Sequence, residues 1–121
     1  MNFLIVTDIF GKTPHLAHLA RQLGPTVQFV DPFNNHLQSP VNEQLQYARF
    51  IQACGHDNYF EKVMFAFNRL STPTTVIAFS AGGTAAWRSQ ARTKHNNIKR
   101  LVAFYPSQVR HYLSVDAKLP C

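Results

Sequence analysis

The sequence predicts an α/β domain built on an open, mostly parallel β-sheet, and two observations favour this fold class. Four short apolar runs alternate with helix-like stretches, which is the pattern of strands joined by helical crossovers. One of these runs, Val76–Phe79, is continuously apolar, as expected of a strand covered on both faces. The chain has 121 residues, of which 45% are hydrophobic, so we expect residues 1–121 to form a single domain.

The first two predicted strands flank a helix with well-marked ends. The strands are Phe3–Thr7 and Val27–Val30. Between them, Thr13 is suited to cap a helix, Pro14 to enter its first turn, and Gly24 to end it. The apolar face of this helix consists of Leu16, Leu19, Ala20 and Leu23.

Two further helices are expected before the third strand. Leu45–Ala53 has helical character, Cys54 and Gly55 interrupt it, and Asp57 is expected to cap the next helix. The apolar residues of that next helix recur at helical spacing, which favours packing in the core over a ligand site. They are Phe60, Val63, Met64, Phe67 and Leu70.

The third predicted strand, Thr75–Phe79, runs into a helix that extends from Ala81 to about Lys94, and Leu101–Phe104 is the fourth strand. Right-handed crossovers and the long excursion between strands two and three predict the spatial order 2-1-3-4, with helices on both faces. In such a sheet the topological switch point lies between strands one and three. A ligand is therefore expected outside the carboxyl ends of these two strands.

The net charge of +6 arises entirely after Ser80, where seven basic residues accompany a single acidic one. A basic segment can bind phosphates, but no helix-turn-helix, zinc-finger or aromatic RNA-binding pattern accompanies this one. We therefore expect no nucleic-acid partner and interpret the segment as a solvated helix end and loop.

Composition also argues against a membrane protein and a metalloprotein. No segment approaches the roughly 18 apolar residues of a membrane span, and the amino terminus has the pattern of a first strand, not of a signal peptide. Two cysteines and six scattered histidines form neither a disulfide framework nor a metal-ligand spacing. We expect no membrane association, no metal, no cofactor and a cytoplasmic location.

Ser80 is the main candidate for chemistry. It stands within Ala78–Gly82, between a predicted strand and a predicted helix, in a motif one methyl group away from the Gly-x-Ser-x-Gly of nucleophile elbows. The pattern alone is equally typical of a glycine-rich turn in any α/β protein. The predicted topology adds weight, because it brings Ser80 and the loop Asp8–Gly11 to the same crevice. Acyl transfer there would use the N–H groups of Ala81 and Ile9 to stabilise the oxyanion.

At these two loops the sequence resembles the dienelactone hydrolase family of α/β-hydrolases. Ile5–Gly11 is similar to the family's strand and loop ending in Glu-Ile-Phe-Gly, and Phe79–Gly83 is similar to its nucleophile elbow. Asp31-Pro32 and Ala103–Tyr105 resemble the segments after two other strands of the family. The resemblance covers nearly the whole chain.

The resemblance implies a hydrolase that acts on carboxylic esters or lactones through Ser80 as nucleophile. It implies that the N–H groups of Ala81 and Ile9 form the oxyanion hole and that Asp8 is an acid near the resting nucleophile. The implied partner is a small-molecule ester or lactone. The candidates to line an apolar acyl pocket are Phe10, Phe33, Phe79 and Tyr105, although packing in the core is the more conservative interpretation of each. Arg110 is a candidate anchor for a substrate carboxylate.

The sequence departs from the family at two points. Dienelactone hydrolases have cysteine at the position of Ser80, which leaves the lactone substrate open. Hydrolases of this fold order their triad as nucleophile, acid and histidine, but the only acid after Ser80 is Asp116, and the histidines His95 and His111 precede it. We therefore expect an incomplete hydrolase with little turnover, whose base and orienting acid lie beyond residue 121.

Two other classes of function stay open. A non-catalytic module could bind an anion at the turn and helix start, using donors from Ser80, Gly82, Gly83 and Thr84. An interaction protein could instead form a homodimer through the exposed edge of the fourth strand.

Overall fold

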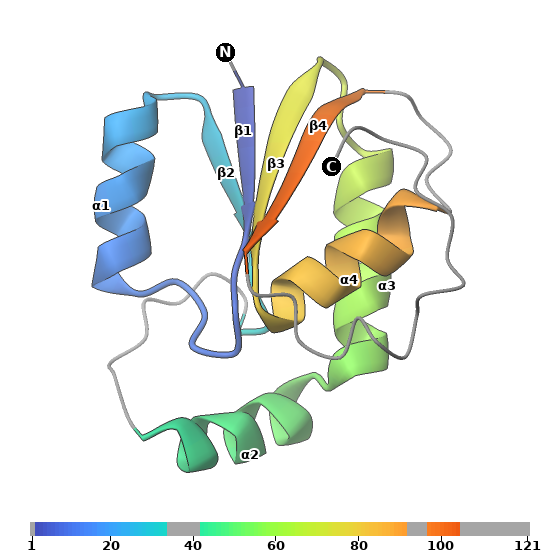
Figure 1. The fold of residues 1–121 in the computed structure, drawn as a ribbon. Coiled ribbons are helices and arrows are strands. Elements are labelled where there is room, and N and C mark those ends of the chain that lie inside the picture. The colour runs from blue at the N-terminus through green and yellow to red at the C-terminus, as the bar shows by residue number, and fades with distance from the viewer. Residues whose placement is uncertain (1, 34–41, 92–96, 105–121) are drawn as a thin grey trace.

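The computed structural model describes residues 2–33, 42–91 and 97–104, which form a parallel β-sheet with helices on both faces (Figure 1). The strands are β1 (Asn2–Val6), β2 (Val27–Val30), β3 (Thr74–Phe79) and β4 (Ile98–Phe104). The helices are α1 (Pro14–Leu23), α2 (Glu43–Ala53), α3 (His56–Asn68) and α4 (Ala81–Gln90). The strands pair in parallel in the order β2-β1-β3-β4, so the predicted fold class and strand order are confirmed.

The helices are distributed unevenly around the sheet. Helices α3 and α4 lie together on one side, and α1 lies on the opposite side (Figure 1). Helix α2 lies beyond the carboxyl ends of the strands, where the loops after β1 and β3 also emerge (Figure 1). None of these described helices is long and apolar enough to cross a membrane.

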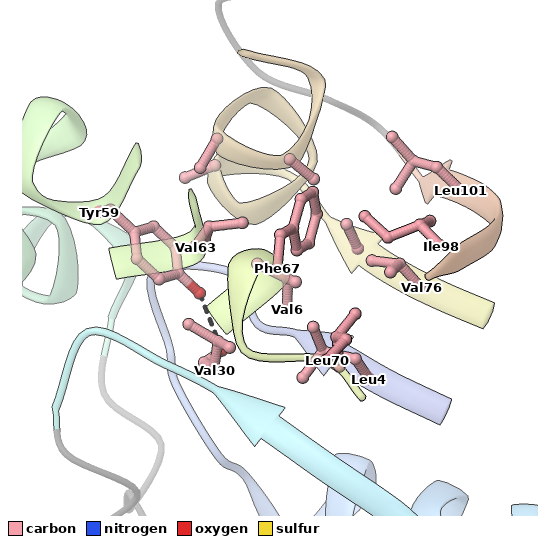
Figure 2. Packing of buried hydrophobic residues seen from close by; sticks show 14 of the residues in the cluster. Leu4, Val6, Val30, Tyr59, Val63, Phe67, Leu70, Val76, Ile98 and Leu101 are labelled. Carbon is pink, nitrogen blue, oxygen red and sulfur yellow. Dashed lines mark hydrogen bonds between the residues drawn. The ribbon is translucent and has the colours of Figure 1, made fainter. Parts of the chain in front are cut away.

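The main core lies between the sheet and the side that carries α3 and α4 (Figure 2). Its fully or nearly fully buried side chains include Leu4, Val6, Val63, Phe67, Val76 and Leu101. On α3, Tyr59 is fully buried together with Val63 and Phe67, whereas Phe60 and Met64 are only half-buried. The predicted apolar stripe is therefore partly wrong, because Tyr59, four residues before Val63, lies on the buried face of α3 and Phe60 and Met64 lie at its margin.

The ends of α1 agree with the sequence. The Leu16 N–H donates to Thr13 Oγ1 at 3.4 Å, and Pro14 stands in the first turn. Gly24, at the end of α1, adopts a φ of 116°, a conformation that only glycine adopts readily.

The start of α3 differs from the prediction. Asp57 is not the cap, because α3 begins at His56 and Gly55 occupies the capping position with a φ of 81°. The N–H groups of Cys54 and Gly55 both donate to the Phe50 carbonyl, and these two hydrogen bonds end α2. Because α3 begins at the residue after Gly55, the two helices are separated only by Cys54 and Gly55. Asp57 pairs instead with Arg88 on α4, with 3.1 Å between Oδ1 and Nη1.

The last two elements also have different bounds from those predicted. Strand β4 begins at Ile98, three residues before the predicted start. Helix α4 is described to Gln90, and its predicted end near Lys94 lies outside the described residues.

Candidate active site

Ser80 occupies the turn between β3 and α4 in an unusual backbone conformation. Its φ is 52° and its ψ is −118°, and no other non-glycine residue in the described ranges has a positive φ. Holding an L-residue in such a conformation costs about 1–3 kcal/mol. A strained strand-to-helix turn of this kind presents a serine hydroxyl at the carboxyl edge of the sheet, as nucleophile elbows do.

Hydrogen bonds on both sides hold the Ser80 turn. The Ser80 N–H donates to the Phe104 carbonyl at the end of β4 at 2.8 Å, and the Thr84 N–H donates to the Ser80 carbonyl at 3.1 Å. The rings of Phe79 and Phe104 stack beside this contact, with their centroids 5.3 Å apart. Both backbone polar groups of the strained residue are therefore satisfied, which offsets part of the conformational cost.

The start of α4 lies directly against the end of β1. A Cβ atom on Gly82 would stand 2.7 Å from the Val6 carbonyl oxygen and 2.9 Å from Val6 Cγ1, and it would also collide with the Thr7 carbonyl oxygen. Only glycine allows this approach of a helix to a strand end. The structure thus brings the Ser80 turn beside the loop after β1, as the topology predicted.

The loop after β1 is a turn closed by Asp8. Its carbonyl accepts the Gly11 N–H at 3.1 Å, and its Oδ1 accepts the Phe10 N–H at 2.9 Å. Gly11 adopts a φ of 71°. The described residues offer no hydrogen-bond acceptor to the Ile9 N–H of this loop.

The two predicted oxyanion donors therefore lie on adjoining segments of the same sheet edge. Ala81 is the first residue of α4, so its N–H has no partner within the helix, and none is present elsewhere in the described part of the chain. Both Ile9 and Ala81 are buried. Free N–H groups in a poorly solvated position next to a helix start are suited to binding a negatively charged oxygen.

Asp8 lies beside these donors as a half-buried carboxyl group. Burial raises the pKa of Asp8 above its ordinary value of 3.8, and the hydrogen bond from the Phe10 N–H opposes part of this rise. The Asp8 carboxylate therefore stabilises the loop by accepting the Phe10 N–H, whereas its partial burial destabilises the charged form.

Asp8→Asn is expected to raise the free energy of unfolding at neutral pH. Because the pKa of Asp8 is higher in the folded state, the wild type loses stability as the pH rises from about 3.8 through the folded-state pKa. Asparagine has no such titration and keeps an Oδ1 that can accept the Phe10 N–H. Urea denaturation at a series of pH values should show a difference between the two proteins that widens with pH and then levels off. A difference that does not change with pH would contradict this.

The described residues place no histidine in contact with Ser80. His15 and His18 lie on α1, and His56 begins α3, where its Nε2 is 3.1 Å from the Tyr47 hydroxyl. Phe10 and Phe79 are half-buried near the predicted site. Phe33, also expected to line the acyl pocket, is half-buried and packs against the core. The remaining predicted site residues and the triad candidates lie outside the described residues; they are Tyr105, Arg110, His95, His111 and Asp116.

No metal site accompanies the Ser80 turn in the described part of the chain, where no cluster of three or more histidine, cysteine, aspartate or glutamate side chains occurs. A cavity of about 280 Å³ is present at the opposite, amino-terminal edge of the sheet, lined by the first residues of β1, β2 and β3. Its one charged side chain, Arg69, is exposed. The strained turn, not this cavity, is therefore the better candidate for chemistry.

Three polar residues around the site were missed by the sequence analysis. Thr7, Gln46 and Tyr59 are buried beneath the loop after β1. Gln46 precedes the buried Phe50 by four residues on α2, and Tyr59 precedes Val63 by four on α3. The spacing of four residues indicates that Gln46 and Tyr59 lie on the buried faces of their helices. It does not indicate a role near the site, because that role depends on which distant polar group each side chain contacts.

No family model matches the chain, and a comparison with curated proteins found no match. The class of protein is therefore defined by fold and site geometry: an α/β domain with a strained serine turn at the carboxyl edge of a parallel sheet.

Proposed function

We propose that this protein is a serine hydrolase of the dienelactone hydrolase type, with Ser80 as the nucleophile and a carboxylic ester or lactone as the substrate. The observation that carries this proposal is the φ of 52° at Ser80, because such strain at a strand-to-helix turn persists where the side chain has a role. The adjoining N–H groups of Ile9 and Ala81, which find no acceptor among the described residues, support it.

In this mechanism the Ser80 Oγ attacks the carbonyl carbon of the ester, and the carbonyl oxygen becomes an oxyanion. The N–H groups of Ile9 and Ala81 donate to that oxygen, and the positive end of the α4 dipole adds to its stabilisation. The tetrahedral intermediate then expels the alcohol, which takes up, through solvent water, the proton that the Ser80 hydroxyl lost on attack, and an acyl-enzyme remains. Water hydrolyses this acyl-enzyme to the carboxylic acid and restores the Ser80 hydroxyl. Ser80 is thus the nucleophile, and Ile9 and Ala81 are the oxyanion donors. No general base contacts Ser80 among the described residues.

The surroundings favour an apolar acyl group and a cytoplasmic protein. Phe10 packs against the core beside the donor loop and leaves part of its ring accessible. Phe79 stacks on Phe104, so its ring can form one immobile side of an acyl pocket but cannot move to accommodate the substrate. The sequence has two cysteines, Cys54 and Cys121, and no disulfide framework, which is in keeping with a reducing compartment.

A fluorophosphonate probe tests the proposal directly, because it traps an activated serine hydroxyl without requiring turnover. We expect one adduct per chain on the peptide that contains Ser80, formed slowly because no described base assists. Oxyanion stabilisation alone still leaves a rate about 10³-fold above that of an unassisted hydroxyl. Intact-mass and peptide mass spectrometry should show the adduct in the wild type and its loss in Ser80→Ala.

Ser71→Ala is the matched control, because Ser71 is an exposed serine at the opposite edge of the sheet. Its labelling should equal that of the wild type. Labelling spread over several serines, or unchanged labelling in Ser80→Ala, would refute the assignment of Ser80 as nucleophile.

The alternative is a non-catalytic anion-binding module, and one observation favours it. Thr84 Oγ1 is buried in the first turns of α4 and has no partner in the described part of the chain. A bound phosphate or sulfate at the helix start would then raise the melting temperature while the fluorophosphonate left Ser80 unmodified.

A further inference from the structure

The direction of the Ile9 N–H depends on the peptide unit that it shares with the Asp8 carbonyl. The peptide bond is planar and trans, so fixing the carbonyl on one side fixes the N–H on the other. The Asp8 carbonyl accepts two hydrogen bonds, from Thr7 Oγ1 at 3.0 Å and from the Gly11 N–H at 3.1 Å. A buried side chain therefore takes part in aiming the Ile9 N–H.

The Thr7 hydroxyl is itself held from α3. It is fully buried and lies 3.2 Å from the Tyr59 hydroxyl. The Tyr59 hydroxyl also lies 2.7 Å from the Thr7 carbonyl oxygen and 3.1 Å from the Val30 carbonyl oxygen, and Figure 2 shows it directed at Val30. Because burial raises the pKa of Tyr59 well above its ordinary value, the hydroxyl keeps the single proton that it shares among these acceptors.

The peptide unit after Ile9 is held from α2. Gln46, whose side chain is almost completely buried, donates from Nε2 to the Ile9 carbonyl at 2.9 Å. Ile9 is therefore fixed on both sides, by Thr7 through the Asp8 carbonyl and by Gln46 through its own carbonyl. The Ile9 N–H is therefore directed opposite to the Asp8 carbonyl within their shared peptide unit, and it has no acceptor in the described ranges.

We propose that Thr7 is a positioning residue for the oxyanion site, whose buried hydroxyl sets the direction of the Ile9 N–H with the support of Tyr59 and Gln46. This inference rests on the proposed function, because it gives the Ile9 N–H the role of an oxyanion donor. Thr7 touches neither the substrate nor Ser80 in this arrangement. It acts through the backbone of the next two residues.

Thr7→Val and Thr7→Ser form a matched pair for testing this role. Valine keeps the shape of threonine and removes the hydroxyl, whereas serine keeps the hydroxyl and removes the methyl group. We expect Thr7→Val to lower the rate of fluorophosphonate labelling at Ser80 by about tenfold, less than the loss of a whole oxyanion donor. Thr7→Ser should stay within about twofold of the wild type. A merely structural role would give labelling rates that follow the melting temperatures of the two variants.

A second measurement reports the direction of the N–H without any reaction. The residual dipolar coupling of the Ile9 amide depends on the orientation of its N–H vector, and that of Val76 in the core sheet serves as a reference. We expect the Ile9 coupling to change in Thr7→Val, to be preserved in Thr7→Ser, and the Val76 coupling to stay constant in both.

The two measurements separate the possible failures. An unchanged Ile9 coupling in Thr7→Val, or equal labelling rates in Thr7→Val and the wild type, would overturn the positioning role. If the wild type shows no labelling at Ser80 at all, the proposed function fails, and the Ile9 coupling still decides whether Thr7 aims that N–H.

Discussion

Gly82→Ala is expected to lower the free energy of unfolding by about 3 kcal/mol, the upper end of the usual cost of overpacking. At an ordinary position inside a helix the same substitution stabilises by up to about 1 kcal/mol. At Gly82 the new Cβ meets the carbonyl oxygens of Val6 and Thr7, which are backbone atoms of a paired strand end and cannot rotate away. Urea denaturation monitored by circular dichroism measures the difference.

Gly24→Ala separates this collision from backbone strain. A Cβ at Gly24 meets no atom within 4 Å, but the φ of 116° is unfavourable for alanine. We expect a loss of about 1–3 kcal/mol from strain alone. If Gly82→Ala is as stable as the wild type, the close approach of α4 to β1 is not a property of the folded protein.

Phe67→Ala is expected to destabilise the protein by about 4 kcal/mol, a large part of the roughly 5–15 kcal/mol that stabilises a typical domain. Phe67 is fully buried between α3 and the sheet, where it lies among core side chains such as Val6 and Val76 (Figure 2). Truncation removes the transfer free energy of the ring and leaves a cavity that the surrounding core fills only in part.

Phe65→Ala is the matched control on the same helix. Phe65 is 62% exposed, and the Arg69 guanidinium lies 5.3 Å from the centroid of its ring. Losing this contact should cost about 0.5–1 kcal/mol. Chemical denaturation of both variants tests the assignment of the buried face of α3, and similar losses at the two positions would show that this assignment is wrong.

The sequence was sufficient to predict the sheet and the place of the candidate site. Alternating apolar runs and the long excursion before β3 predicted the order β2-β1-β3-β4, and this order alone brings Ser80 to the loop at Asp8. These features depend on patterns that extend over many residues, so they survive errors at single positions. The nucleophile itself was a prediction from local pattern, and it stays one.

The details that hold the site could not be predicted in the same way. Asp57 looked like a helix cap because aspartate favours that position, but Gly55 is the cap and α3 begins two residues earlier. Tyr59 and Gln46 contact residues 52 and 37 positions away in the sequence, at Thr7 and Ile9 respectively. No local pattern reports such partners, because burial of a polar side chain depends on which distant carbonyl needs a donor.

The hydrogen bond from the Ser80 N–H to the Phe104 carbonyl has a consequence for dynamics. Phe104 is the last residue of β4, which is an edge strand in the described sheet, and its ring is 44% exposed. Strand ends with few buried neighbours open locally at a lower free energy than the centre of a sheet. When the end of β4 frays, the Ser80 N–H loses this acceptor, so we expect the Ser80 turn to become more mobile whenever the last pairing of the edge strand opens.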